Sequence, residues 1–182
     1  MKKITIVTGN PGKVRELEAL AMGKLDFIMH DLDIDEIQSL DLETIVKDKA
    51  KKAFARIKEP IIVDDVSAGL ASLKGLPGPF IKFFNKTLGS DALYQLAKPE
   101  DDTVTINCMA AYYDGEKFIL GRGTVNGKVV APRGSNGFGF DSVVIPAGQK
   151  QTMAEMSEEE KMQVSHRGKA FRALFSQLEI LK

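Results

Sequence analysis

The sequence predicts an α/β fold in which helices flank an elongated mixed β-sheet, and three observations indicate it. Apolar strand-like runs alternate with helical patterns in the first third of the chain, the order typical of parallel strands joined by helices. Strands joined by a tight turn fill the middle of the chain and add antiparallel pairs. No linker-like segment interrupts the 182 residues, so we expect a single domain spanning residues 1–182.

Strands and helices alternate over the first part of the chain. The β-branched run Ile4–Val7 is the first expected strand, and Val14–Met22 has apolar residues at helical spacing. Leu25–Leu32 is a second expected strand. Leu42–Ile57 is a second amphipathic helix, because apolar residues recur there every three or four positions and lysines fill the intervening turns. A proline ends this helix, and the short strand Ile61–Asp65 closes with two carboxylates.

A loop rich in glycine and proline, residues 75–79, separates this part from the middle of the chain. Two short helices are expected after it, over Phe80–Phe84 and Asp91–Leu96. The runs Val104–Tyr113 and Lys117–Gly121 then predict a hairpin across an Asp-Gly turn.

The last part of the chain begins with more strand, over Thr124–Val130, and then a glycine-rich loop over residues 132–141. Ser157 and Glu160 form a capping box, which predicts the start of a final helical region reaching Leu181.

The composition excludes several classes of protein. The chain has 25 Lys and Arg against 25 Asp and Glu, so no overall positive field attracts nucleic acid or an anionic membrane, and any anion must be held locally. No apolar run approaches the roughly 18 residues that suggest a membrane-spanning helix. Cys108 is the single cysteine, and no signal-like segment precedes the first strand, so we expect a soluble cytoplasmic protein.

The segment Thr8–Lys13 joins the first strand to the first helix. A glycine-containing turn there leaves backbone N–H groups unpaired at a helix N-terminus, and Lys13 adds a mobile positive charge, which suits a phosphate. The segment is not a Walker A motif, because the glycine spacing is too short and Val14 stands where Ser or Thr should follow the lysine. An ordinary strand-to-helix turn with a solvated lysine is the alternative.

Two adjacent carboxylates, Asp64 and Asp65, stand at the end of the third expected strand. Carboxylates directed together out of a sheet edge repel one another unless they share a cation or a proton. Mg²⁺ is the natural candidate, because it binds one or two carboxylates together with substrate phosphates. A strand-end turn or a helix cap is the alternative for the pair, and Glu36 is either a further ligand or a surface residue.

The loop segment Asn136–Asp141 carries two phenylalanines that follow no helical or strand period. An aromatic ring on such a loop can stack on a nucleobase, and Asp141 can accept hydrogen bonds from base N–H groups. Phe138 and Phe140 are otherwise core residues, and we expect a core role for one of them.

The segment Ser165–Ala170 is rich in hydrogen-bond donors and contains His166 and Arg167. Such donors can bind a carbonyl group of a base. A helix N-cap followed by surface charges is the alternative. The other histidine, His30, lies in a strand-like segment without evident partners, where we expect a structural role.

Together these segments resemble the inosine triphosphate pyrophosphatase family, whose members hydrolyse non-canonical purine nucleoside triphosphates. The resemblance covers essentially the whole chain in order and rests on the motifs TGNPGK, EIQ, IIVDD, GLPGP, APRG, GFGFD, AEMSEEEK and SHRGKA. It implies hydrolysis of ITP, dITP and XTP to the nucleoside monophosphate and pyrophosphate. It also implies an elongated fold of two lobes with a central active-site cleft, and a homodimeric assembly.

The resemblance implies roles for individual residues. Triphosphate binding falls to Thr8, Gly9, Asn10, Lys13 and Lys49. Nucleoside binding falls to Phe138, Gly139, Phe140, Asp141, Lys161, His166 and Arg167. Glu36 and Asp65 would hold Mg²⁺, and Asp65, supported by Asp64, would also activate the attacking water.

Two positions depart from the family pattern. Val66 follows the acidic pair where relatives usually carry Ser or Thr, so a hydroxyl is missing unless Ser67 replaces it. Ser142 stands where a proline usually follows GFGFD. Neither change removes a charge or a metal ligand, so they bear on affinity and loop geometry more than on the type of reaction.

Two other functions remain open from the sequence. A nucleotide-binding regulatory module would keep the phosphate loop and the base pocket but would not need paired carboxylates. A nucleotide phosphatase would release orthophosphate instead of pyrophosphate.

Overall fold

The computed structural model describes residues 2–178, and a seven-stranded mixed sheet forms the centre of the fold. Its strands are, in spatial order, β2 (Leu25–His30), β1 (Lys2–Val7), β3 (Ile61–Leu70), β5 (Thr103–Tyr113), β6 (Phe118–Val129) and β7 (Val144–Pro146), and the short β4 (Pro77–Gly78) pairs with β3. β1 runs parallel to β2 and β3, and the other pairs are antiparallel. The predicted α/β fold with a mixed sheet is confirmed.

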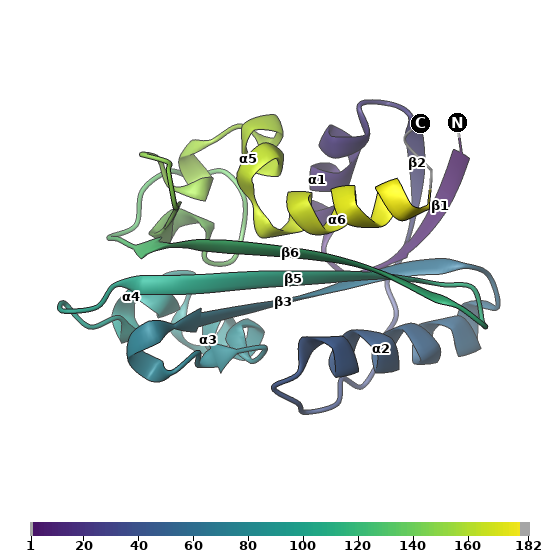
Figure 1. The fold of residues 1–182 in the computed structure, drawn as a ribbon, viewed down its shortest axis with the longest axis horizontal. Coiled ribbons are helices and arrows are strands. Elements are labelled where there is room, and N and C mark those ends of the chain that lie inside the picture. The colour runs from purple at the N-terminus through teal and green to yellow at the C-terminus, as the bar shows by residue number, and fades with distance from the viewer. Residues whose placement is uncertain (1, 179–182) are drawn as a thin grey trace.

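Helices enclose the sheet around β1 and β3 (Figure 1). α1 (Pro11–Ala21) and α6 (His166–Gln177) pack on one face, where Leu17 and Phe171 are fully buried against Ile62. α2 (Leu42–Ile57) packs on the opposite face, against Val63 and Met109. Neighbouring residues of β3 therefore belong to different layers of the core, as the period of two along a strand requires.

Two glycines of β6 allow α6 to lie close to the sheet. A Cβ at Gly121 or Gly123 would collide with the backbone of Ala170 or His166 in α6. The close packing fixes the position of the first turn of α6, and with it His166 and Arg167. α5 (Glu158–Val164) precedes α6 and also lies near α1 (Figure 1).

A second lobe forms at the far end of the long strands. α3 (Ile81–Leu88) and α4 (Ala92–Leu96) lie there (Figure 1), and their residues Ile81 and Leu93 pack with Ala68 and Ile106 of the sheet. Short 3₁₀ helices complete the lobes: η1 (Ala71–Leu73), η2 (Asp141–Val143) and η3 (Met153–Glu155). Among the helices within residues 2–178, none is long and apolar enough to cross a membrane.

Most of the predicted elements are confirmed, with shifts at their ends. The helix at Leu42–Ile57 has the predicted bounds, and the capping box of Ser157 and Glu160 is present at the start of α5. The final helical region consists of two helices, because Ser165 ends α5 in an extended conformation and caps α6. The predicted end of this region at Leu181 lies outside the described residues.

β3 has an open stretch on the edge that faces away from β5. β1 pairs with this edge at Ile61 and Ile62, and β4 pairs with it at Ala68 and Gly69. Between these pairings, residues 63–67 have no strand neighbour on that edge within the described chain. The interruption leaves room for side chains from both lobes.

Candidate active site

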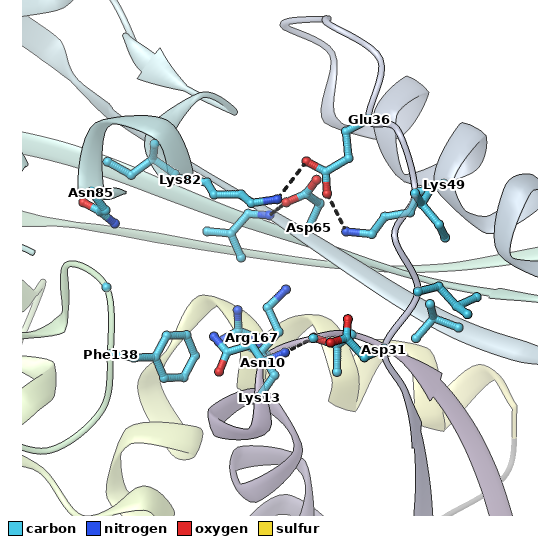
Figure 2. A pocket seen from close by; sticks show the side chains of 18 of the residues that line it. Asn10, Lys13, Asp31, Glu36, Lys49, Asp65, Lys82, Asn85, Phe138 and Arg167 are labelled. Atoms are coloured by element: carbon cyan, nitrogen blue, oxygen red, sulfur yellow. Dashed lines mark hydrogen bonds and ion pairs between the residues drawn. The ribbon is translucent and has the colours of Figure 1, made fainter. Parts of the chain in front are cut away.

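A cleft of about 900 Å³ opens beside this edge of β3, and its volume lies in the range usual for small-molecule sites. Its walls come from the loop 8–13, the segment 31–36, α2, β3, α3, the loop 138–141 and the first turn of α6 (Figure 2). All of the site residues predicted from the sequence line this cleft except Asp64 and Lys161, which are buried behind its wall.

The loop after β1 is shaped by its own side chains. The Asn10 side chain caps α1 by accepting a hydrogen bond from the Gly12 N–H (2.9 Å), and the Asn10 N–H donates to Thr8 Oγ1 (3.1 Å). Lys13 follows in the first turn, and its Nζ lies 3.0 Å from Asp64 Oδ1. The Lys13 side chain is only 15% exposed, so the alternative of a solvated lysine is wrong. A helix N-terminus beside a fixed cation can bind a phosphate.

The sequence predicts that Asp64 and Asp65 stand at the end of a strand, and this prediction is wrong. They lie in the middle of β3, because β5 continues to pair with β3 as far as Leu70. Adjacent strand residues point to opposite faces, so the two carboxylates do not converge out of the sheet edge. Asp64 is fully buried towards α1 and α6, whereas Asp65 faces the cleft.

Asp64 binds two cations of the site. Its Oδ1 accepts from Lys13 Nζ, and its Oδ2 accepts from Arg167 Nε at 3.1 Å. Burial alone would raise the pKa of Asp64, but Lys13 and Arg167 outweigh burial and hold that pKa well below its usual range. Asp64 is therefore a permanent anion that orients these cations.

Asp65, Glu36 and two lysines form a second charged group across the cleft (Figure 2). Glu36 Oε1 lies 2.9 Å from Lys49 Nζ, and Glu36 Oε2 lies 3.5 Å from Lys82 Nζ. Burial raises the pKa of Asp65 by more than Lys49 and Lys13 lower it. Burial lowers the pKa of Lys49, but Asp65 and Glu36 outweigh it and keep this lysine charged.

The donor set of this group fits a hard divalent cation. Glu36 and Asp65 supply carboxylate oxygens, the ligands that such cations prefer. Within residues 2–178, no cluster of three or more His, Cys, Asp or Glu side chains is arranged to hold a metal ion. A cation bound here would need further oxygens from a ligand, as cations that bridge a carboxylate and a phosphate do.

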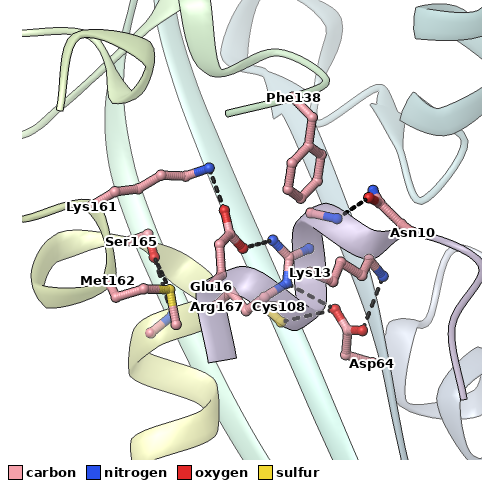
Figure 3. Close-up of polar contacts among 12 residues, drawn as sticks. Asn10, Lys13, Glu16, Asp64, Cys108, Phe138, Lys161, Met162, Ser165 and Arg167 are labelled. Carbon is pink, nitrogen blue, oxygen red and sulfur yellow. Dashed lines mark hydrogen bonds and ion pairs between the residues drawn. The ribbon is translucent and has the colours of Figure 1, made fainter. Parts of the chain in front are cut away.

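Charged side chains that alternate in sign connect the loop 138–141 with the loop 8–13, and Figure 3 shows those from Lys161 to Lys13. Successive ion pairs link these side chains in the order Asp141, Lys161, Glu16, Arg167, Asp64 and Lys13. Glu16 is its centre: Oε1 pairs with Lys161 Nζ, and Oε2 lies 2.6 Å from Arg167. Burial raises the pKa of Glu16, but the two cations outweigh it and lower the pKa. We call this set the charge chain.

Sequence reasoning missed Glu16, although a signal for it exists. Glu16 stands four residues before Leu20 and therefore shares the buried side of α1. A carboxylate at a position that the helical period assigns to the core must find cations there.

The loop 138–141 places its two aromatic rings differently. Phe140 is 7% exposed and packs in the core of the second lobe, which confirms the expected core role for one of the pair. Phe138 is half-buried and lies over the first turn of α1, where a Cβ on Gly12 would approach its ring to 2.7 Å. Lys161 Nζ and the Arg167 guanidinium lie 4.9 Å and 5.4 Å from the centre of the ring. The ring is thus held at the cleft wall by fixed neighbours.

Asp141 and Lys161 hold this loop in place through hydrogen bonds and an ion pair. Asp141 Oδ2 accepts from the Phe138 N–H at 2.8 Å and from Lys161 Nζ at 2.5 Å. The Lys161 side chain is 4% exposed and lies behind Phe138 rather than in the cleft. Burial raises the pKa of Asp141 by more than Lys161 lowers it.

The first turn of α6 brings His166 and Arg167 to the cleft. Ser165 Oγ accepts from the Gly168 N–H at 3.1 Å, so the N-cap alternative is confirmed for Ser165. The alternative of surface charges is wrong, because His166 and Arg167 are both buried. Burial, with Arg167 and Lys161, lowers the pKa of His166 well below its usual value, so the imidazole is neutral.

Four further polar residues of the cleft were not predicted. Asp31 and Asp33 follow β2, and Lys82 and Asn85 lie one turn apart on α3. The spacing of Lys82 and Asn85 places them on one side of α3. The sequence did not indicate that this side faces the cleft, because the other residues of the cleft come from distant parts of the chain. Ser67 does not line the cleft, so the hydroxyl missing at Val66 is not replaced.

The α/β fold gathers cations, carboxylates and an aromatic ring in one cleft between two lobes, and its relatives, the inosine triphosphate pyrophosphatases described below, belong to the class of enzymes that cleave phosphate anhydrides. The chain belongs to the Ham1 family, whose model matches residues 4–177.

Similar proteins share most of the length of the chain. An inosine triphosphate pyrophosphatase of Yarrowia lipolytica is 43% identical over 94% of this chain and 93% of its own. One of Schizosaccharomyces pombe is 36% identical over 92% of this chain and 90% of its own. The solved structure of the Staphylococcus aureus Ham1 protein covers 100% of both chains with a TM-score of 0.81 and 26% identity. A dITP/XTP pyrophosphatase of Mycobacterium abscessus covers 97% of this chain and 98% of its own, with a TM-score of 0.69 and 26% identity.

Proposed function

We propose that this protein hydrolyses ITP, dITP and XTP to the nucleoside monophosphate and pyrophosphate, and so removes these nucleotides from the pool. The observation that carries the proposal is that Lys13, at a helix N-terminus, and the half-buried carboxylate Asp65 line one cleft. Membership of the Ham1 family and the names of its relatives support it.

The cations of the cleft are suited to a triphosphate. Lys13 comes from α1, Lys49 from α2 and Lys82 from α3, so they approach the cleft from different elements. Carboxylates hold them in place: Asp64 pairs with Lys13, and Glu36 pairs with Lys49 and Lys82. Preorganised cations of this kind stabilise the charge that develops on transferring phosphoryl groups.

We assign Mg²⁺ as the divalent cation and Glu36 and Asp65 as its protein ligands. Two carboxylates that need oxygens from a ligand match the way in which Mg²⁺ binds with substrate phosphates. When bound, Mg²⁺ would neutralise charge on the triphosphate and on the leaving pyrophosphate.

Asp65 is the residue that we assign as general base. Its raised pKa, caused by burial, makes it a better proton acceptor than an exposed carboxylate. Asp65 would accept a proton from the water that attacks the α-phosphorus, as the bond from this phosphorus to the bridging oxygen breaks and pyrophosphate leaves. Asp64 has a positioning role instead, because it holds Lys13 and Arg167 and does not line the cleft.

The base would be selected by hydrogen-bond polarity. A donor aimed at the 6-oxo group of hypoxanthine or xanthine would face the 6-amino group of ATP, and such a buried mismatch costs about 1–3 kcal/mol. ATP is therefore expected to be a poor substrate. GTP shares the 6-oxo group, so its rejection must depend on its 2-amino group.

The decisive experiment is an assay of the purified protein with ITP, XTP, dITP, GTP and ATP in Mg²⁺, scoring pyrophosphate against orthophosphate. The proposal requires pyrophosphate release from the first three and poor turnover of ATP. Orthophosphate as the product would identify a phosphatase. Binding of nucleotides without turnover would identify a regulatory module.

Three further properties belong to this proposal. We infer one domain over residues 1–182, supported by the single sheet that extends through both lobes, and a homodimer, supported by the family resemblance, which sedimentation would test. A cytoplasmic location is supported by the substrate class. The balanced overall charge supports the expectation that nucleic acid is not a partner.

A further inference from the structure

Asn85 of α3 has a side chain whose hydrogen bonding the fold leaves incomplete. The residue lines the cleft, and its Oδ1 atom is buried without a hydrogen-bond partner in the described part of the chain. A buried acceptor without a partner costs free energy, so native structures usually retain one only where something else satisfies it. Because the Asn85 side chain lines the cleft, a bound ligand is a natural partner for its amide group.

The position of Asn85 along the cleft indicates which part of a nucleotide it meets. Lys82, one turn earlier on α3, reaches towards Glu36 and the proposed metal ligands. Asn85 lies on the same side of the pocket view as Phe138, across the cleft from it (Figure 2), and a Cβ on Gly139, next to Phe138, would lie 3.4 Å from the Asn85 amide nitrogen. A triphosphate near Lys82 therefore places the nucleoside beside Asn85.

The surroundings of Asn85 favour the base over a phosphate. Val66, Ile81 and Phe140 line this part of the cleft with apolar groups, and the neutral His166 contributes Nδ1, a second buried atom without a hydrogen-bond partner in the described chain. Largely apolar walls with a few unsatisfied polar atoms are typical of a site for a planar organic group.

The chemistry of the amide points to one edge of the base. Asn carries an acceptor next to a donor on one planar group. A 6-oxopurine presents the complement on its six-membered ring, where the N1–H donor is next to the 6-oxo acceptor. We propose that Asn85 hydrogen-bonds this edge of a purine stacked on Phe138, and is a specificity-determining residue. The inference rests on the proposed function and adds a contact from the second lobe.

The test replaces Asn85 by leucine, which has a similar volume and no hydrogen-bonding group. Turnover of ITP, dITP and purine riboside 5′-triphosphate, which lacks both the 6-oxo group and N1–H, is measured in Mg²⁺, together with the inhibition constant of inorganic tripolyphosphate. For N85L we expect kcat/KM to fall about tenfold for ITP and dITP, chiefly through KM, because a buried hydrogen bond is lost. The value for purine riboside triphosphate should fall much less. Tripolyphosphate should inhibit as before, because it has no base.

A matched control is T87V, since Thr87 lies on α3 and does not line the cleft; it should leave all of these values unchanged. A second variant, N85A, repeats the test if leucine prevents folding. Equal losses for all three nucleotides, no loss, or weaker inhibition by tripolyphosphate would overturn the inference. A loss for ITP but not for dITP would identify ribose recognition instead and would also overturn it. If the unaltered protein hydrolyses none of the nucleotides, the proposed function fails first.

Discussion

Asp64 and Asp65 are adjacent in the sequence but differ in surroundings and charge. Asp64 faces α1 and α6, and the cations Lys13 and Arg167 hold its pKa well below the usual range. Asp65 lines the cleft, and burial raises its pKa. The alternation of a β-strand therefore gives the pair separate tasks, one structural and one chemical.

Asp65→Asn should abolish most of the turnover. We expect kcat to fall by about 10²- to 10⁴-fold, because the amide cannot accept the proton of the attacking water. KM should change far less. Steady-state kinetics with ITP measures both constants, and Asp102→Asn, an exposed change outside the cleft, is the control. A variant with near-normal turnover would remove Asp65 from the mechanism.

Asp64→Asn should reduce the stability of the folded protein. It leaves Lys13 and Arg167 without their buried anion, which typically costs about 3–5 kcal/mol in the free energy of unfolding. Since the folded pKa of Asp64 is depressed, its stabilisation is present above about pH 4 and is lost as pH falls through the folded value. Urea denaturation at neutral pH measures the loss. Asp65→Asn is the matched comparison and should cost much less, because burial already disfavours the charge of Asp65.

The pH dependence of turnover follows from the raised pKa of Asp65. A general base must be deprotonated, so kcat/KM should rise with pH through that pKa, which lies above the value of about 3.9 for an exposed aspartate. A kcat/KM profile between about pH 4 and pH 8 at limiting Mg²⁺, where the free enzyme holds no metal at Asp65, measures it. A flat acidic limb would contradict the assignment.

At the scale of elements, close packing between α6 and β6 determines where the nucleoside-binding residues stand. Gly121 and Gly123 have no Cβ and so allow the backbone of α6 to approach the strand. His166 and Arg167 occupy the first turn of that helix. The geometry of the cleft thus depends on residues that do not line it.

Gly123→Ala should reduce both stability and activity. The added methyl group would meet the backbone near His166, and overpacking of this kind costs about 1–3 kcal/mol. KM for ITP should rise as the first turn of α6 moves. Thermal unfolding and kinetics are the measurements, with the exposed Asn126→Ala on the same strand as control. Unchanged stability would show that α6 has more freedom than this packing implies.

Local sequence signals predicted an element well where its start, its apolar period and its end were all marked in the sequence. The bounds of α2 follow from its capping residue Asp41, its apolar period and the proline that comes after it. The extension of β3 beyond Asp65 was missed, because pairing with β5, rather than any local pattern, maintains the strand as far as Leu70. The division between α5 and α6 depends on the extended conformation of Ser165 in a segment with continuous helical character.

The same distinction holds for the site. Thr8, Lys13 and Phe138 stand in recognisable motifs and were assigned to the cleft in advance. Glu16 and Asn85 were not assigned, because the place of each in the site depends on contacts with residues far away in the sequence. Residue type and spacing identify a motif, whereas only the fold shows which motifs lie next to one another in the site.

At the scale of the molecule, a protein with no net charge holds concentrated charge at the junction of its two lobes. Lys13 and Lys49 belong to the part around β1, and Lys82 belongs to α3 in the second lobe. A polyanion bound among them contacts both lobes and should stabilise the folded protein as a whole.

Inorganic tripolyphosphate with Mg²⁺ should therefore raise the temperature of unfolding. A ligand at about 100 times its Kd adds about 2.7 kcal/mol to the free energy of unfolding if it binds only the folded state. Differential scanning calorimetry measures the shift, which Lys13→Met and chelation of the metal should each reduce. A temperature that does not respond to tripolyphosphate would argue against a phosphate site at this junction.

The charge chain constrains how the sequence of this protein can diverge. Its acids and bases alternate and balance, so each inner member neutralises two neighbours in a buried region. A substitution that removes the charge of one member alone leaves its partner as an unpaired buried charge. Simultaneous substitution of both partners preserves neutrality. Glu16, Arg167 and Lys161 should consequently vary together or not at all across descendants of this gene, although they lie on three different helices.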